Sequence, residues 1–432
     1  ASQFGRAETS SRCNTIKHCA LGTGHTSPCR GTLGHIHQAR QFHSDQRPAL
    51  VSPVGRCVVS GQVFQHIFTN APIAFQPQHE APIDPSSMSR WRKRVGADRL
   101  ELLLKETIDL AIRTKQLPKR DLTQVIIDTT VQEKNITHPT DSKLLYTAIR
   151  KLGQAANERS IRLRQTYIRV GKRASIKASR YAHAKQFKRM RRSLRKLRTY
   201  VGRMIRDIER KTLRIDEDLV VILAKAERLR NQQPTDSNKL YSWHEPEVKC
   251  ISKGKAHKRY EFGCKVSVAM TNEKNWVVGM QALHGNPYDG HTLASALAQA
   301  ERIIRRQVKE AFVDKGYRGH DYQGDAQVHI TGQRGKGKAG GALRKRKKRR
   351  SAIEPKIGHL KSDNRMDRNY LKGHEGDRLN ALLAGIGANF RKLLAAFWRA
   401  HSELLLNGLR RGGVKQEHQQ NNRHGQPLAI AA

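Results

Sequence analysis

Three carboxylates stand where they could act together on a phosphodiester bond. Asp128 follows the apolar run 125–127, Asp314 follows the apolar run 311–313, and Glu354 lies in a basic segment that is expected to begin a helix. Carboxylates held on rigid strands beside phosphate-binding cations are what metal-assisted phosphodiester chemistry requires. The pattern therefore predicts a site for Mg²⁺ or Mn²⁺, with two ions held by the three carboxylates.

Metal-assisted chemistry requires that the fold bring the three acids close together. We expect Asp128 and Asp314 to lie on adjacent strands of one sheet and Glu354 to approach them from a helix, since shared metal ions need neighbouring ligands. Each aspartate alone also fits a turn or cap former, which is the simpler interpretation of an acid after a strand. Three adjacent acids repel one another unless metal ions or nearby cations offset their charge.

The composition points to a polyanionic partner. The chain has 82 Lys and Arg residues against 37 Asp and Glu residues, a formal net charge of +45. Such a charge attracts nucleic acid with a strong dependence on salt. The sequence has no apolar run of about 18 residues, so we expect no membrane span. Six cysteines in 432 residues are too few for a disulfide framework, which favours the reducing cytoplasm.

The elements that must position the acids divide the chain into regions. Residues 1–63 show no sustained periodicity and are expected to be disordered; Cys13, Cys19 and Cys29 lie near histidines there, but their spacing fits no common zinc module. Residues 64–120 predict a helical, DNA-binding region whose helix is capped by Ser86 or Ser87. The rest divides into a mixed α/β core at 121–141 and 235–400, a basic helical insertion at 142–234, and a disordered tail at 401–432.

The insertion carries a heptad pattern. Apolar residues recur at alternating intervals of three and four, which predicts a buried seam on one helix face: Phe187, Met190, Leu194, Leu197, Val201, Met204 and Ile208. The other faces are basic and include Arg191, Arg195 and Arg198. A charged face is often only solvated, but the lack of matching acids favours contact with DNA or a second protomer.

Three blocks around the acids resemble a known family. Residues 127–132, 313–319 and 350–361 are similar to the catalytic blocks of Asp-Asp-Glu transposases from bacterial insertion sequences, in the subgroup with an interrupted RNase H-like core. Residues 362–366 and 369–381 and the upstream segment 78–94 also resemble that subgroup. The similarity extends over about 64–399.

The resemblance implies an activity and a set of roles. It assigns Asp128, Asp314 and Glu354 to Mg²⁺ or Mn²⁺, in an enzyme that cleaves double-stranded DNA at element ends and joins the freed 3′-hydroxyl to target DNA. Arg350 and Lys361 match basic positions of the Tyr-Arg-Glu-Lys glutamate block, and Arg318 follows the second aspartate. Lys347 stands in the usual tyrosine position.

The resemblance also implies a homodimer on DNA and a location at the bacterial nucleoid. A non-catalytic DNA-binding protein descended from such an enzyme is the second hypothesis. Three intact acids argue against that hypothesis, and their replacement would separate the two.

Overall fold

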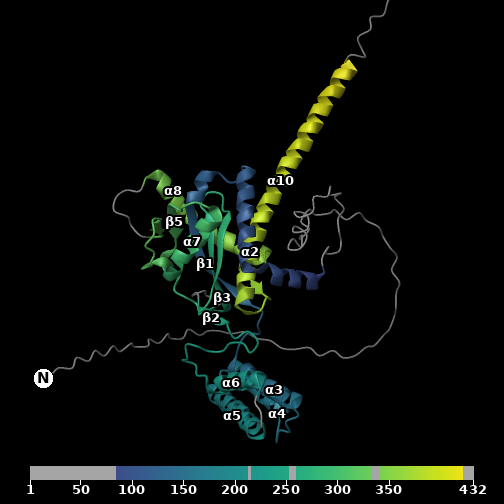
Figure 1. Cartoon of the computed structure of the whole chain (residues 1–432), viewed down its shortest axis with the longest axis vertical. Helices are drawn as coiled ribbons and strands as arrows, with labels where there is room; N and C mark the ends of the chain where they lie inside the picture. The colour runs from purple at the N-terminus through teal and green to yellow at the C-terminus, as the bar shows by residue number, and fades with distance from the viewer. Residues whose placement is uncertain (1–83, 213–215, 253–258, 333–339, 422–432) are drawn as a thin grey trace, which may run out of the picture. The chain divides into compact units, whose positions relative to one another are not determined.

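The computed structural model describes residues 84–421, apart from 213–215, 253–258 and 333–339 (Figure 1). The expectations for residues 1–63, for the start of the region 64–120 and for the last residues of the chain therefore lie outside the described part.

One mixed sheet forms the core of the α/β unit. Strand β1 pairs antiparallel with β3 and parallel with β5, β3 pairs antiparallel with β4, and β5 pairs parallel with β6. Two short strands, β2 and β7, pair with β3 and β1. The mixed α/β class is confirmed, and the strand arrangement is consistent with an RNase H-like core. The strands are β1 (Gln124–Lys134), β2 (Lys249–Ser252), β3 (Tyr260–Thr271), β4 (Val277–Leu283), β5 (Glu310–Val313), β6 (Gln327–Ile330) and β7 (Arg368–Asn369).

Alternation along β1 gives the sheet two buried faces. Val125 and Ile127 enter the larger apolar core, whereas Ile126 packs with Phe312 and Ile353 on the opposite face. Successive side chains of a strand point to opposite faces, so an uninterrupted apolar run indicates burial on both sides. The larger core is completed by α2 (Pro85–Arg113), α7 (Leu293–Ile304) and α10 (Gly373–Asn421), and the smaller one by α8 (Gly341–Arg349) and α9 (Ile353–Asp363).

Both ends of the described chain differ from the expectation. Asp84, not Ser86 or Ser87, caps α2, because its side chain accepts a hydrogen bond from the Ser86 amide (2.8 Å) and Pro85 occupies the first helical position. The face of α2 around Leu104 joins the larger core, so the described part of region 64–120 packs against the sheet domain. The predicted disordered tail is wrong for residues 401–421, because α10 continues through them without a proline to end it.

The predicted helical insertion is present between β1 and β2. It has its own apolar core, separate from that of the sheet. The seam of α5 is buried from Leu194 to Ile208, but Phe187, at the first position of the helix, is 51% exposed. The insertion consists of α3 (Asp141–Glu158), α4 (Ile168–His183), α5 (Phe187–Lys211) and α6 (Glu217–Asn231).

Short 3₁₀ helices connect several of these elements: η1 (Lys119–Thr123), η2 (Asp289–Thr292), η3 (Lys315–Tyr317) and η4 (Arg350–Ala352). Within the described ranges, no helix combines the length and the apolar character that crossing a membrane requires.

Candidate active site

The sheet places the two aspartates as the sequence predicts. In the parallel pairing of β1 with β5, Ile126 stands opposite Phe312. Asp128, within β1, lies two residues beyond Ile126, and Asp314, directly after β5, lies two residues beyond Phe312. The two acids therefore stand at the same level of neighbouring strands. Asp128 lies within β1, which continues past this residue to Lys134.

The three predicted acids meet at the guanidinium group of Arg350. Its Nη2 atom lies 3.0 Å from Oδ2 of Asp128 and 3.8 Å from Oδ2 of Asp314, and its Nη1 atom lies 3.1 Å from Oε1 of Glu354. The Arg350 side chain is only 14% exposed. One partly buried cation therefore joins carboxylates from β1, from the end of β5 and from α9, and Glu354 approaches from a helix as predicted.

Backbone amides fix the two aspartates. The amide of Thr129 donates to Oδ1 of Asp128 (2.7 Å), and the amide of Gly316 donates to Oδ1 of Asp314 (2.8 Å). In both residues the other oxygen, Oδ2, faces Arg350. Glu354 differs, because its side chain is 65% exposed. The site thus combines two anchored carboxylates with a third that has freedom to adjust.

A fourth carboxylate, Asp289, was not predicted as a site residue. The Asp289 side chain accepts hydrogen bonds from Thr129 Oγ1 (2.9 Å) and Lys265 Nζ (3.0 Å). A Cβ atom at Gly316 would lie 3.0 Å from Oδ1 of Asp314 and 3.2 Å from Oδ2 of Asp289. Asp289 and Asp314 therefore flank the same glycine.

The negative charge of these acids affects the pKa of the buried Tyr317 hydroxyl. Burial raises the pKa of its hydroxyl, and the negative charges of Asp128, Asp289 and Asp314 raise this pKa further. Repulsion among these acids is offset by their ion pairs with Arg350 and Lys265. The converging donors are all carboxylate oxygens, which suit the hard cations Mg²⁺ and Mn²⁺. The metal itself stays a prediction.

The basic residues expected to contact DNA lie in two groups. Near the acids, Arg350 binds the carboxylates themselves, Lys361 lies on α9 with Glu354, and Arg318 is exposed just after η3. Lys347, in the position expected for tyrosine, is half-buried on α8.

The other group belongs to the insertion. Arg191 and Arg195 are exposed on α5, as a nucleic-acid contact requires. Arg198 differs from these two, because it is half-buried and its Nη2 donates to the carbonyl oxygen of Gln232 (3.0 Å); its predicted contact with DNA stays a prediction. This hydrogen bond links α5 to the end of α6, because Arg198 lies beside the apolar seam.

Comparison with known proteins gives a single partial match. No family model matches the chain, and no solved structure matches it. A Rhizobium meliloti protein, described as uncharacterized protein ORF8 in nfe locus, is 51% identical over 110 residues. These residues make up 26% of this chain and 53% of that protein, so the chain spans about half the length of this curated relative.

Proposed function

We propose that the protein is a metal-dependent DNA transposase of the Asp-Asp-Glu class, which cleaves the ends of an insertion sequence and joins them to target DNA. The observation that carries this proposal is the convergence of Asp128, Asp314 and Glu354 on one guanidinium group. Carboxylates gathered from three separate elements, in a chain of formal net charge +45, suit metal-assisted chemistry on DNA.

The side chains have distinct roles in this proposal. Asp128, Asp314 and Glu354 would hold two Mg²⁺ or Mn²⁺ ions, which when bound activate the attacking oxygen and stabilise the leaving one. The amides of Thr129 and Gly316 orient the aspartates toward the ions. Arg350 keeps the three acids together in the metal-free protein. Its planar guanidinium also suits a phosphate oxygen of the DNA, so the same side chain can serve either anion.

The partners follow from the charge. Double-stranded DNA, at the element ends and at the target, is the polyanion that the exposed arginines would contact. We propose that two copies of the chain act together on a pair of ends, at the bacterial nucleoid in the cytoplasm.

A strand-cleavage assay tests the proposed activity. The substrate is a DNA fragment carrying the genomic sequence on either side of the coding region, with Mg²⁺ or Mn²⁺. We expect cleavage by the wild type and its loss in Asp128→Asn, Asp314→Asn and Glu354→Gln. These variants should still bind the fragment, because phosphate contacts dominate the affinity. Glu106→Gln, which removes an exposed acid of α2, is the matched control and should cleave normally.

Two results would reject the proposal. One is cleavage by Asp314→Asn at nearly the wild-type rate. The other is a wild-type protein that binds the fragment but neither cleaves it nor binds Mn²⁺ at the acids, which would favour the non-catalytic DNA-binding hypothesis.

A further inference from the structure

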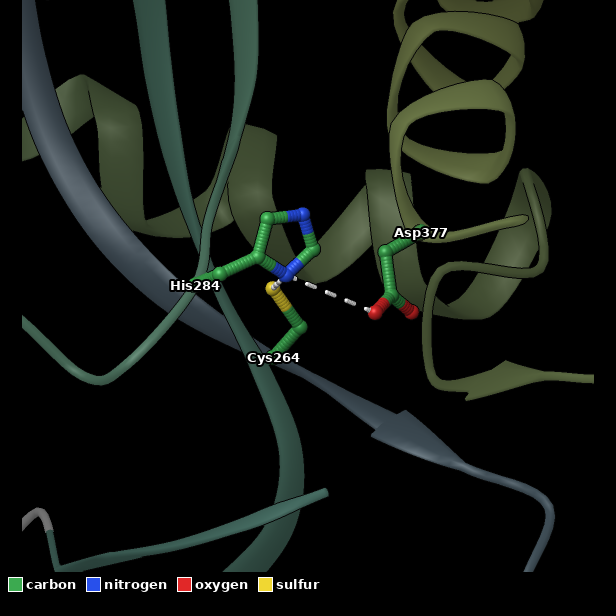
Figure 2. Close-up of side chains that lie close together, drawn as sticks. All are labelled: Cys264, His284 and Asp377. Carbon is green, nitrogen blue, oxygen red and sulfur yellow. Dashed lines mark hydrogen bonds and ion pairs between the residues drawn. The ribbon is translucent and has the colours of Figure 1, made fainter. Parts of the chain in front are cut away.

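A second group of potential metal ligands lies outside the carboxylate site. Cys264 of β3, His284 just after β4, and Asp377 of α10 turn their side chains toward one another (Figure 2). The ligand atoms Sγ, a ring nitrogen and a carboxylate oxygen all lie within 4.8 Å of one another. Cys264 and Asp377 are buried, and His284 is partly buried. Segments that are distant in sequence therefore bring a thiol, an imidazole and a carboxylate close together.

The Nδ1 atom of His284 is the centre of this group. It lies 3.6 Å from Sγ of Cys264, 3.9 Å from Oδ2 of Asp377 and 2.8 Å from Nδ1 of His374. One ring nitrogen either carries a single proton or accepts one, so it makes a good hydrogen bond with only one of these neighbours. A metal ion bound by this nitrogen, by Sγ of Cys264 and by Oδ2 of Asp377 would give all three atoms a partner. A tetrahedral zinc ion places its sulfur and nitrogen ligands about 3.6 Å apart, which matches the first distance.

The carboxylate of Asp377 is already oriented for such a role. Its Oδ1 atom accepts a hydrogen bond from Nδ2 of Asn369 (2.8 Å) and lies 3.2 Å from Nζ of Lys134. Its other oxygen, Oδ2, is the one that faces His284. Metal-binding carboxylates are commonly held in this way by hydrogen bonds to the oxygen that does not bind the metal.

We propose that Cys264, His284 and Asp377 form a structural Zn²⁺ site. Thiolate and imidazole ligands select zinc over Mg²⁺, so this site and the carboxylate site take different metals. Cys264 loses its proton to solvent when zinc binds, and in the metal-free chain its thiol donates toward the carbonyl oxygens of Lys265 and Leu283 (3.3 and 3.4 Å). The ion would tie β3 and the end of β4 to α10. This inference does not depend on the proposed transposase activity.

Zinc binding is tested on the full chain, in a background where the four N-terminal cysteines are replaced by serine. This background removes other thiols: Cys13, Cys19, Cys29 and Cys57. After dialysis against Zn²⁺, we expect one bound zinc per chain, measured by elemental analysis, and a higher thermal unfolding midpoint with zinc than after chelation. Replacement by Co²⁺ should give a thiolate-to-cobalt charge-transfer band.

The variants identify the ligands. Cys264→Ser should lose the bound zinc, the charge-transfer band and the zinc-dependent rise in midpoint, whereas Cys250→Ser, which changes the free cysteine of β2, should keep all three. Asn369→Ala leaves every ligand in place and should weaken zinc binding roughly 10- to 100-fold, because the orientation of Asp377 is lost. A background protein that retains no zinc would overturn the proposal, whatever the variants do. So would equal zinc content in a folded Cys264→Ser protein.

Discussion

Asp289 accepts a hydrogen bond from Thr129, with 2.9 Å between Thr129 Oγ1 and Asp289 Oδ1, and Thr129 directly follows Asp128 in β1. The fourth carboxylate is thereby tied to the strand that carries the first predicted acid. Its oxygen Oδ1 also pairs with Lys265, so Asp289 connects the site to β3. Asp289 thus contributes negative charge beside the predicted metal ligands while its own position is fixed by two donors.

We predict that Asp289→Asn weakens Mn²⁺ binding at the carboxylate site. Asparagine keeps an acceptor for Thr129 and Lys265 but removes one negative charge, and a loss of roughly tenfold in affinity is of the size expected for a charge a few ångströms away at a partly exposed site. Calorimetric titration with Mn²⁺ measures the change. Asp367→Asn removes an exposed acid elsewhere and should bind Mn²⁺ as the wild type does. Equal affinity in both variants would show that Asp289 serves only the fold.

We predict that replacing Arg350 makes the stability of the protein depend more strongly on Mg²⁺. Arg350→Gln leaves Asp128, Asp314 and Glu354 without their shared cation, so the metal-free variant should lose roughly 2 kcal/mol of unfolding free energy, as for a lost hydrogen bond to a charged group. Added Mg²⁺ should then raise the unfolding midpoint more in the variant than in the wild type, because the ion relieves the repulsion that the guanidinium no longer offsets.

A second arginine on the neighbouring helix provides the control. Arg346 pairs with Glu310 (3.1 Å) outside the group of predicted acids. Arg346→Gln should also lower the stability, but Mg²⁺ should shift its midpoint no more than that of the wild type. If Mg²⁺ shifts Arg350→Gln no more than Arg346→Gln, then Arg350 is a structural cation only.

The sequence predicted that Asp128 and Asp314 lie close together because each acid directly follows a short apolar run, and such runs can be recognised as strands from the sequence alone. An apolar run buried on both faces indicates an inner strand, and the shared level of Asp128 and Asp314 in the sheet follows from the parallel pairing of β1 with β5. Asp289 could not be found in this way. It lies in a turn before a helix, where an acid normally indicates a cap, and only the tertiary packing brings Lys265 and Thr129 to it.

The group of Cys264, His284 and Asp377 was also not predictable from the sequence. A sequence can indicate zinc ligands through short spacings, such as those tested for the N-terminal cysteines. Cys264, His284 and Asp377 have no such spacing and meet because β3, β4 and α10 pack together. The contact of Arg198 with Gln232 was not predicted for a related reason, because the heptad pattern does not show that the end of α6 lies within reach of its side chain.

The exposed arginines of α5 should contribute to the salt dependence of DNA binding. Replacing Arg191 and Arg195 by glutamine should lower the affinity for unrelated DNA sequences about equally, and should flatten the log–log salt slope by roughly 0.9 for each lost phosphate contact. Arg198→Gln should instead destabilise the insertion, because it removes the hydrogen bond to Gln232. An unchanged slope in the double variant, measured by fluorescence anisotropy over a salt series, would leave this face as solvated surface.

Lys392 of α10 should make stability depend on pH. Its Nζ atom lies 4.6 Å from the centre of the Trp276 ring and donates to the carbonyl oxygen of Lys274. Burial, together with the positive charges of Lys356 and Lys274 and against the opposing charge of Asp121, lowers the pKa of Lys392 to about 7. The ordinary value is 10.5. Between these values the unfolded chain binds more protons than the folded one, so this group makes stability rise with pH.

We therefore predict that Lys392→Met removes part of the rise in stability between pH 7 and pH 10. Below pH 7 the folded wild type carries a charged, partly buried ammonium that methionine lacks, so the variant should gain most there, and its advantage should shrink as the pH approaches 10. Denaturant unfolding at several pH values measures this difference in slope. Lys93→Met, which changes an exposed lysine of α2, should leave the slope unchanged. Parallel pH curves for the wild type and Lys392→Met would mean that Lys392 keeps an ordinary pKa, with its ammonium group hydrated beside Trp276.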